Sequence, residues 1–306
     1  MSKIQIMIST YNGAAYVREQ LKSILRLSNA DDVSVLIRDD GSTDDTPSIL
    51  AEYAEEYGFR VIYGENVGVN RSFQALFEAA DDSCEFFAYC DQDDSWLPDK
   101  VARAVSVLEK ADRAIPAMYA SRAYLTDAQG TVIGATPKNR RAPSFYNAIV
   151  QNVCIGHTQV YNKEMLALLR RSYSPAIVII DHWAYLLASA YGNVFFDDEP
   201  TSLYRQHGKN VIGYSRSALD TMKGRWKRAR TGMGKRMAAQ NKAFYAMHGA
   251  TIPNADHAKE LSRFLSHNTS FFRRLGYALH CRARRQTFTE NVCFRLLYLF
   301  GGYRTD

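Results

Sequence analysis

Residues 3–25, KIQIMISTYNGAAYVREQLKSIL, form a first unit of strand, polar turn and helix. KIQIMIST is short, apolar and rich in β-branched residues, which predicts a buried strand. After the turn the apolar spacing becomes helical, because Val17, Leu21, Ile24 and Leu25 fall on one stripe. A buried strand followed by an amphipathic helix is the repeating unit of α/β folds.

The same unit repeats as far as residue 90. Strands and helices are predicted in alternation, at 33–38, from about 46, at 59–63, at 70–80 and at 85–90. This alternation predicts a doubly wound, mostly parallel sheet with helices on both faces. Ligands of such sheets bind beyond the carboxyl ends of the strands, where polar clusters stand at 9–13, 39–42 and 91–94. Three clusters at such ends predict a single site.

The charge of the chain divides it into two parts. Residues 1–215 carry 20 Lys and Arg against 27 Asp and Glu, whereas residues 216–306 carry 18 against 5. After about residue 115 the strand pattern loosens, and beyond residue 213 the chain is predicted to be helical and basic. We therefore expect a catalytic domain over 1–215 and a basic helical C-terminal region over 216–306.

Composition excludes several classes of protein. The 306 residues are 46% hydrophobic and 23% charged, which is typical of a globular protein and excludes disorder, collagen and fibres. The five cysteines form no CxxC pair, so neither a disulfide framework nor a cysteine zinc site is expected. No apolar run reaches the roughly 18 residues of a spanning helix, and the N-terminal run is too short for a signal peptide. We expect a cytoplasmic protein, or one peripheral on the inner face of the plasma membrane.

The polar clusters suit a nucleotide and a metal. Asp91 and Asp93 follow the apolar run FFAYC two positions apart, so both carboxylates can turn toward one hard cation such as Mg²⁺. Asp40 follows another strand and can accept hydrogen bonds from a ribose or a base, and STYNG at 9–13 offers hydroxyls, amides and an aromatic ring. The chain lacks the GxGxxG and GxxxxGK[ST] spacings there, which disfavours simple NAD and ATP sites.

Seven motifs together resemble glycosyltransferase family 2. They are STYNG at 9–13, DDGSTDDT at 39–46, NVGVNRSF at 66–73, DQDDSWLPDK at 91–100, Gly156-His157, DHW at 181–183 and YRQH at 204–207. The resemblance covers about residues 3–215. It implies an α/β fold of the glycosyltransferase A type. DQDD followed by Trp, DHW and YRQHGKN look most like bacterial rhamnosyltransferases that build surface polysaccharides.

The resemblance also implies roles for individual residues. The donor nucleotide sugar would be bound by Thr10, Tyr11, Asn12, Asp40, Arg71, Asp91 and Gln92. A Mg²⁺ or Mn²⁺ ion would be ligated by Asp93 and joined by His207. Asp181 would be the base that takes the acceptor proton. Trp96, His182 and Trp183 would contact the acceptor or the sugar.

Structural explanations stay open for several of these residues. Asp181 precedes LLASAY at helical spacing, so it could serve as a helix N-cap, as a base or as both. His207 could be an ordinary loop histidine, and both tryptophans could be core residues. His182 is either a substitute base or a hydrogen-bond partner, because the family subgroup often places its histidine before the aspartate.

The implied reaction is an inverting, metal-dependent glycosyl transfer. The expected donor is dTDP-L-rhamnose, and the expected acceptor is a growing cell-surface polysaccharide or a lipid-linked glycan. A UDP-sugar donor is the alternative within the family. A sugar-phosphate nucleotidyltransferase would carry a Gly-rich loop after its first strand, which STYNG is not. A non-catalytic nucleotide-sugar-binding scaffold is the alternative of another class.

The basic C-terminal region has three interpretations. It could be a helical cap on the catalytic domain with a solvated arginine face. It could bind an anionic membrane surface, because Trp226, Phe271, Phe272 and Leu275 lie among its basic residues. Nucleic-acid binding suits the charge, but no RNA- or DNA-binding motif accompanies it, and we expect no nucleic-acid partner.

Overall fold

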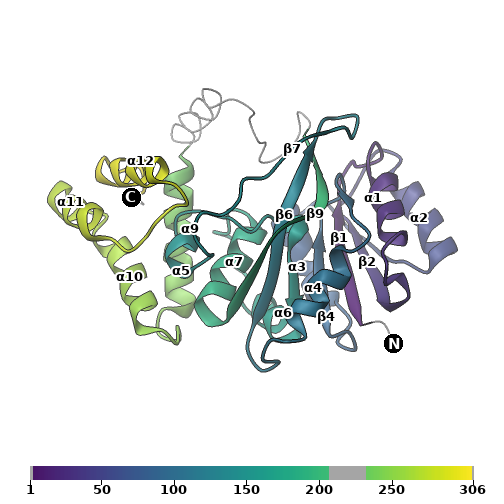
Figure 1. Ribbon diagram of the computed structural model, residues 1–306, viewed down its shortest axis with the longest axis horizontal. Coiled ribbons are helices and arrows are strands. Elements are labelled where there is room, and N and C mark those ends of the chain that lie inside the picture. The colour runs from purple at the N-terminus through teal and green to yellow at the C-terminus, as the bar shows by residue number, and fades with distance from the viewer. Residues whose placement is uncertain (1–2, 207–231, 305–306) are drawn as a thin grey trace.

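A central sheet carries helices on both faces, and further helices extend from one end of it (Figure 1). The structure is a computed structural model that describes residues 3–206 and 232–304. The predicted α/β class is confirmed.

The strands of the described residues form one sheet. They are β1 (Ile4–Thr10), β2 (Val33–Asp39), β3 (Arg60–Tyr63), β4 (Phe86–Cys90), β5 (Ser95–Trp96), β6 (Ala117–Thr126), β7 (Val132–Ala135), β8 (Val160–Asn162) and β9 (Asn193–Arg205). Their order is β3-β2-β1-β4-β8-β6-β9-β5, with β7 paired to β6. The first four strands pair in parallel, as predicted. The sheet then becomes mixed, because β8 runs antiparallel to both β4 and β6.

The helices of the described residues are α1 (Val17–Leu25), α2 (Thr46–Tyr57), α3 (Val69–Ala79), α4 (Lys100–Leu108), α5 (Phe145–Ala148), α6 (Lys163–Arg170), α7 (Ile180–Tyr191), α9 (Met233–His248), α10 (Ala255–Ser266), α11 (Phe271–His280) and α12 (Phe288–Leu299). Helices begin or lie where the sequence predicts them at 17–25, from about 46 and at 70–80, and α4, α5 and α6 are further helices that were not predicted from the sequence. Two 3₁₀ turns, η1 (Ala30–Asp32) and η2 (Gly156–Thr158), complete the set.

Strand alternation divides the core between the two sheet faces. Ile4, Ile6 and Ile8 of β1 belong to the cluster that α1, α2 and α4 cover. Met7 points the other way, into a larger cluster with α3, α6 and α7. Because successive side chains of a strand alternate between faces, one apolar strand supplies both cores.

The C-terminal helices share the larger core. Phe244 of α9 packs edge-on against Trp183 of α7, with ring centroids 5.3 Å apart, and Leu261 and Phe264 of α10 join the same cluster. The domain boundary that we expect near residue 215 lies outside the described residues. Within the described ranges, no helix is both long and apolar enough to cross a membrane.

Candidate active site

The ends of β1, β2 and β4 meet at one edge of the sheet. Because these strands are parallel neighbours, Thr10 pairs with Asp39, and the Thr10 hydroxyl donates to Oδ1 of Asp39 at 3.0 Å. Gln92, beyond β4, bonds the backbone of Tyr11 in both directions: its Oε1 accepts from the Tyr11 N–H at 2.9 Å, and its Nε2 donates to the Tyr11 carbonyl at 3.1 Å. The three polar loops are therefore joined into one surface, as the sequence predicts.

Residues of the two neighbouring loops lie close to the turn after β1. Asn12 has φ 46°, in the left-handed region, and its side-chain oxygen accepts from the Thr43 N–H at 2.8 Å. A Cβ at Gly13 would lie 2.1 Å from Oε1 of Gln92, so a larger residue there would displace the Gln92 side chain from the Tyr11 backbone. The Tyr11 side chain is 46% exposed at this edge, where an aromatic platform for a base is expected.

Asp39 ends β2 and Asp40 follows it, and both carboxylates shape loops. Asp39 accepts from the amide and the hydroxyl of Ser42. Asp40 is buried, pairs with the Arg38 guanidinium, and accepts from the N–H groups of Val67 and Gly68 at 3.0 and 2.9 Å. Asp40 thus holds the loop before α3 in place, and its predicted contact with a base stays a prediction.

Arg71 stands on the first turns of α3. Its Nε donates to the Tyr173 hydroxyl at 3.3 Å, and its side chain is exposed. Its predicted role at the donor stays a prediction.

The acidic loop after β4 meets a buried histidine. Ligand atoms of Asp91, Asp94 and His157 all lie within 4.8 Å of one another, the one such cluster of three or more His, Cys, Asp or Glu groups in the described part of the chain. Burial, reinforced by Asp94, Asp93 and Asp181, raises the pKa of Asp91 well above its ordinary value. A divalent cation would relieve this repulsion between carboxylates.

Orphaned atoms at the cluster fit a metal site. Nδ1 of His157 lies 2.8 Å from Oδ2 of Asp94, yet these two buried atoms form no hydrogen bond with each other or with any other group in the described residues. Buried polar atoms normally have a partner, and carboxylate oxygens with an imidazole nitrogen suit a divalent cation. The residues present therefore fit a metal ion.

The cluster differs from the predicted ligand pair. Asp93 is not one of its three members, and His207 lies outside the described residues. His157 was part of a recognised motif, but no short spacing connects it with the acidic loop. Only the position of η2 beside β4 brings them together.

Arg205 belongs to the YRQH motif, but no role of its own is predicted for it from the sequence. This buried arginine ends β9, and its backbone N–H donates to Oδ1 of Asp94 at 3.2 Å. Its guanidinium donates to the Asp93 carbonyl at 3.2 Å and to Glu19 at 2.6 Å. Arg205 thus fixes the backbone of the acidic loop against α1.

Asp181 lies in the first turn of α7, buried behind the cluster. Its Oδ2 accepts from the Gly156 N–H at 2.9 Å, and its Oδ1 from the His182 N–H at 2.6 Å. Ile179, not Asp181, is the N-cap of the helix. Burial raises the pKa of Asp181 from 3.8 to about 6, although both hydrogen bonds and His157 oppose that rise. A carboxyl group with this pKa is ionised at neutral pH and can accept a proton.

The predicted sugar-contacting residues lie in the core. His182 is buried, and its Nε2 lies 2.6 Å from the Ala148 carbonyl of α5. Trp183 is 1% exposed and packs against α9, and Trp96 is 3% exposed with the Lys100 ammonium 4.6 Å from its ring centroid. Packing, rather than contact with a sugar, explains these three side chains in the structure. His182 and Trp183 are covered by α5 and α9, and Trp96 is buried on β5, so the predicted contacts of these three residues with an acceptor or sugar stay a prediction.

Comparison with known proteins places the chain among sugar-transferring enzymes. The model of glycosyl transferase family 2 matches residues 5–169. A protein named dTDP-rhamnosyl transferase RfbG, from Shigella flexneri, is 28% identical over 222 residues, 67% of this chain and 73% of that protein.

Two solved structures share the fold. TarS 1–349 of S. aureus, in complex with UDP, has a TM-score of 0.57 at 15% identity, covering 98% of this chain and 80% of that chain. A mannosyltransferase of Pyrobaculum calidifontis, in complex with GDP-Man and Mn²⁺, has a TM-score of 0.52 at 15% identity, covering 98% and 85%.

We predict that His182 makes the fold sensitive to acid. Burial lowers its pKa from 6.5 to about 4. The unfolded chain therefore takes up a proton below about pH 6.5, whereas the folded chain does so only near pH 4, and stability falls as pH drops across that window. Between pH 7 and 4.5 the wild type should lose about 2–3 kcal/mol more unfolding free energy than His182→Gln. Urea unfolding at both pH values measures this, and equal losses in the two proteins would contradict it.

Proposed function

The chain belongs to glycosyl transferase family 2, and from this membership we propose an inverting transfer of L-rhamnose from dTDP-L-rhamnose. The acceptor is a growing cell-surface polysaccharide or a lipid-linked glycan. The observation that carries the proposal is the placement of Asp181 behind the Asp91–Asp94–His157 cluster, joined to it through Gly156. The choice of donor is supported by the 28% identity with the dTDP-rhamnosyl transferase.

The site residues have distinct tasks in this proposal. Thr10, Tyr11, Asn12, Asp40, Arg71, Asp91 and Gln92 bind and orient the donor. Asp181 accepts the proton of the acceptor hydroxyl as that oxygen attacks the anomeric carbon, so a single displacement suffices. Asp94 and His157, with Asp91, would hold a Mg²⁺ or Mn²⁺ ion, which when bound offsets the charge on the departing diphosphate. Asp93 remains a proposed ligand from the same loop.

The donor preference is tested by thermal shift with sugar nucleotides. Of dTDP-L-rhamnose, UDP-N-acetylglucosamine and GDP-mannose, dTDP-L-rhamnose should raise the melting temperature most. The shift should need Mg²⁺ or Mn²⁺, because the carboxylate cluster otherwise repels a diphosphate. A larger shift with the UDP-sugar would overturn the donor assignment. A full shift in excess EDTA would contradict the proposed requirement for a metal ion.

Isosteric variants show, in the same thermal-shift measurement, which residues ligate the metal. Asp94→Asn and His157→Gln should lose most of the metal-dependent shift while keeping the melting temperature of the free protein near that of the wild type. Asp93→Asn is the matched variant from the same loop. If Asp93→Asn alone loses the shift, the ligand assignment returns to Asp93.

The role of Asp181 is tested by turnover. Asp181→Asn keeps the shape of the side chain but cannot accept a proton, so turnover should fall by about 10²–10⁴-fold with the donor thermal shift unchanged. Wild-type turnover should also decline as pH falls through about 6, because protonation of Asp181 removes the base. Wild-type turnover in Asp181→Asn together with its loss in His182→Ala would assign the base to His182.

We also propose that the C-terminal region rests on an anionic membrane surface. Phe271 and Phe272 of α11 are 46% and 81% exposed, beside the basic Arg273. Trp226, a further residue of this hypothesis, lies outside the described residues. The protein should sediment with anionic vesicles and less with neutral ones, and Phe271→Ser with Phe272→Ser should weaken that binding, whereas Tyr63→Ser on β3 should not. Equal sedimentation with both kinds of vesicle would exclude electrostatic binding.

A further inference from the structure

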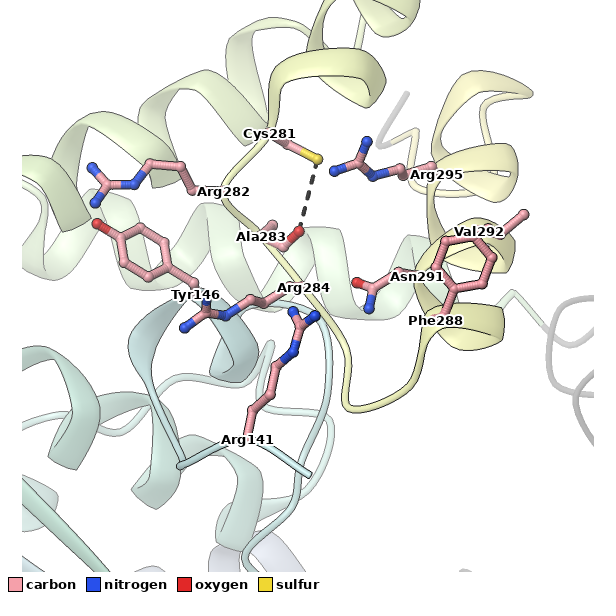
Figure 2. Close-up of a pocket in the computed structure, with 10 residues that line it drawn as sticks. All are labelled: Arg141, Tyr146, Cys281, Arg282, Ala283, Arg284, Phe288, Asn291, Val292 and Arg295. Atoms are coloured by element: carbon pink, nitrogen blue, oxygen red, sulfur yellow. Dashed lines mark hydrogen bonds between the residues drawn. The ribbon is translucent and has the colours of Figure 1, made fainter. Parts of the chain in front are cut away.

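An arginine-lined cavity lies where the catalytic domain meets the C-terminal helices (Figure 2). It has a volume of about 540 Å³. Four of its ten lining residues are arginines, namely Arg141, Arg282, Arg284 and Arg295, and none is acidic. Arg141 comes from the loop before α5, Arg282 and Arg284 from the segment between α11 and α12, and Arg295 from α12 itself.

Among the described residues, only one of the four guanidinium groups pairs with a carboxylate. Arg282 pairs with Asp256 at 2.8 Å and lies over the ring of Tyr146 at 4.5 Å. In the part of the chain that the structure describes, no ion pair includes Arg141, Arg284 or Arg295. Arg295 reaches the Leu279 carbonyl at 3.4 Å, which leaves its charge uncompensated. Several like charges around one cavity repel each other unless an anion joins them.

The segment that carries two of these arginines is held rigidly. Residues 282–286 have no regular secondary structure, yet all five backbone N–H groups are bound. The first two donate to the buried Glu260, and the N–H of Arg284 donates to the Tyr146 carbonyl at 2.9 Å. Fixed backbone positions lower the entropy that the arginines lose when they bind a ligand.

An apolar stripe leads away from the cavity along α12. Phe288, Val292 and Leu296 are spaced four residues apart, and their side chains are 80%, 39% and 49% exposed. Phe288 and Val292 line the cavity themselves, on the side of Arg295 (Figure 2). A ligand that satisfies both surfaces needs an anionic head and an apolar chain.

We propose that this cavity binds the diphosphate head group of a lipid, with the chain along Phe288, Val292 and Leu296. Guanidinium groups bind phosphate oxygens through paired N–H donors, and three of the four have no acidic partner among the described residues. The exposed apolar stripe favours a ligand with an apolar chain over a purely polar anion. The inference goes beyond the proposed transfer reaction, because it assigns a second site outside the catalytic cluster and is argued from the arginine cavity alone.

Titration calorimetry of the full chain with farnesyl diphosphate tests the proposal. EDTA is present throughout, so that no cation carries the probe to the Asp91–Asp94–His157 cluster. Farnesyl diphosphate should bind at least about tenfold more tightly than either inorganic diphosphate or farnesol, because only it engages both surfaces. Equal affinity for inorganic diphosphate, or for farnesol, would overturn the proposal.

Arginine variants test whether farnesyl diphosphate binds in this cavity. Arg141→Gln, Arg284→Gln and Arg295→Gln together should weaken farnesyl diphosphate binding at least about tenfold. The matched control, Lys22→Gln, Arg26→Gln and Lys110→Gln, removes the same charge from exposed positions of the catalytic domain and should bind like the wild type. If both triple variants lose affinity equally, net charge rather than this cavity binds the probe, and the proposal fails.

A second variant keeps the test independent of folding. Phe288 is 80% exposed, so Phe288→Ser should leave the fold intact. It should weaken farnesyl diphosphate binding several-fold and leave inorganic diphosphate binding unchanged. Unchanged affinity for farnesyl diphosphate in this variant would contradict a lipid chain on α12. The thermal shift with dTDP-L-rhamnose, measured separately with metal, reports on the catalytic site alone.

Discussion

The hydrogen bond from the Gly156 amide to the Asp181 carboxylate connects the two halves of the site. It stabilises the negative charge of a buried carboxylate, which without a hydrogen bond would be protonated or excluded from the interior. It also fixes η2 beside β4, where the next residue, His157, meets Asp91 and Asp94. A Cβ at position 156 would come within 3.1 Å of the Asp181 Cβ and 2.7 Å of the Tyr89 ring, so glycine makes this approach possible.

The acidic loop needs support, because its carboxylates repel one another. That support comes from Arg205, at the end of β9, whose guanidinium donates to the backbone carbonyl of Asp93. Carboxylate oxygens of Asp91 and Asp94 lie close to His157, and the positive charge of Arg205 nearby offsets part of the repulsion between the carboxylates. β9 pairs in parallel with β6, and this pairing places the buried Arg205 beside the acidic loop. Arg205 therefore helps to stabilise a site rich in carboxylates.

The C-terminal helices also pack against the helix that carries Asp181. α7 carries Asp181 at its start, and its buried side chains need cover on the side away from the sheet. α9 supplies it with Phe244, and α5 does so through the bond between His182 and the Ala148 carbonyl. The basic region is thus a structural neighbour of Asp181 as well as the carrier of exposed arginines and aromatic side chains. Both a cap and a surface-binding role are compatible with this arrangement.

The amino-acid sequence alone determined the alternation of strands and helices up to residue 90 and the meeting of three polar loops at one sheet edge. Periods of two and of 3.6 residues are local properties, and parallel pairing follows from the repeated strand–helix unit. The tertiary structure alone decided which residues join across that edge. His157 and Arg205 stand more than 60 and 110 residues after the acidic loop, and no short spacing records their approach. It also decided that His182 and Trp183 are core residues, because burial depends on the helices that cover α7, which the DHW motif does not reveal.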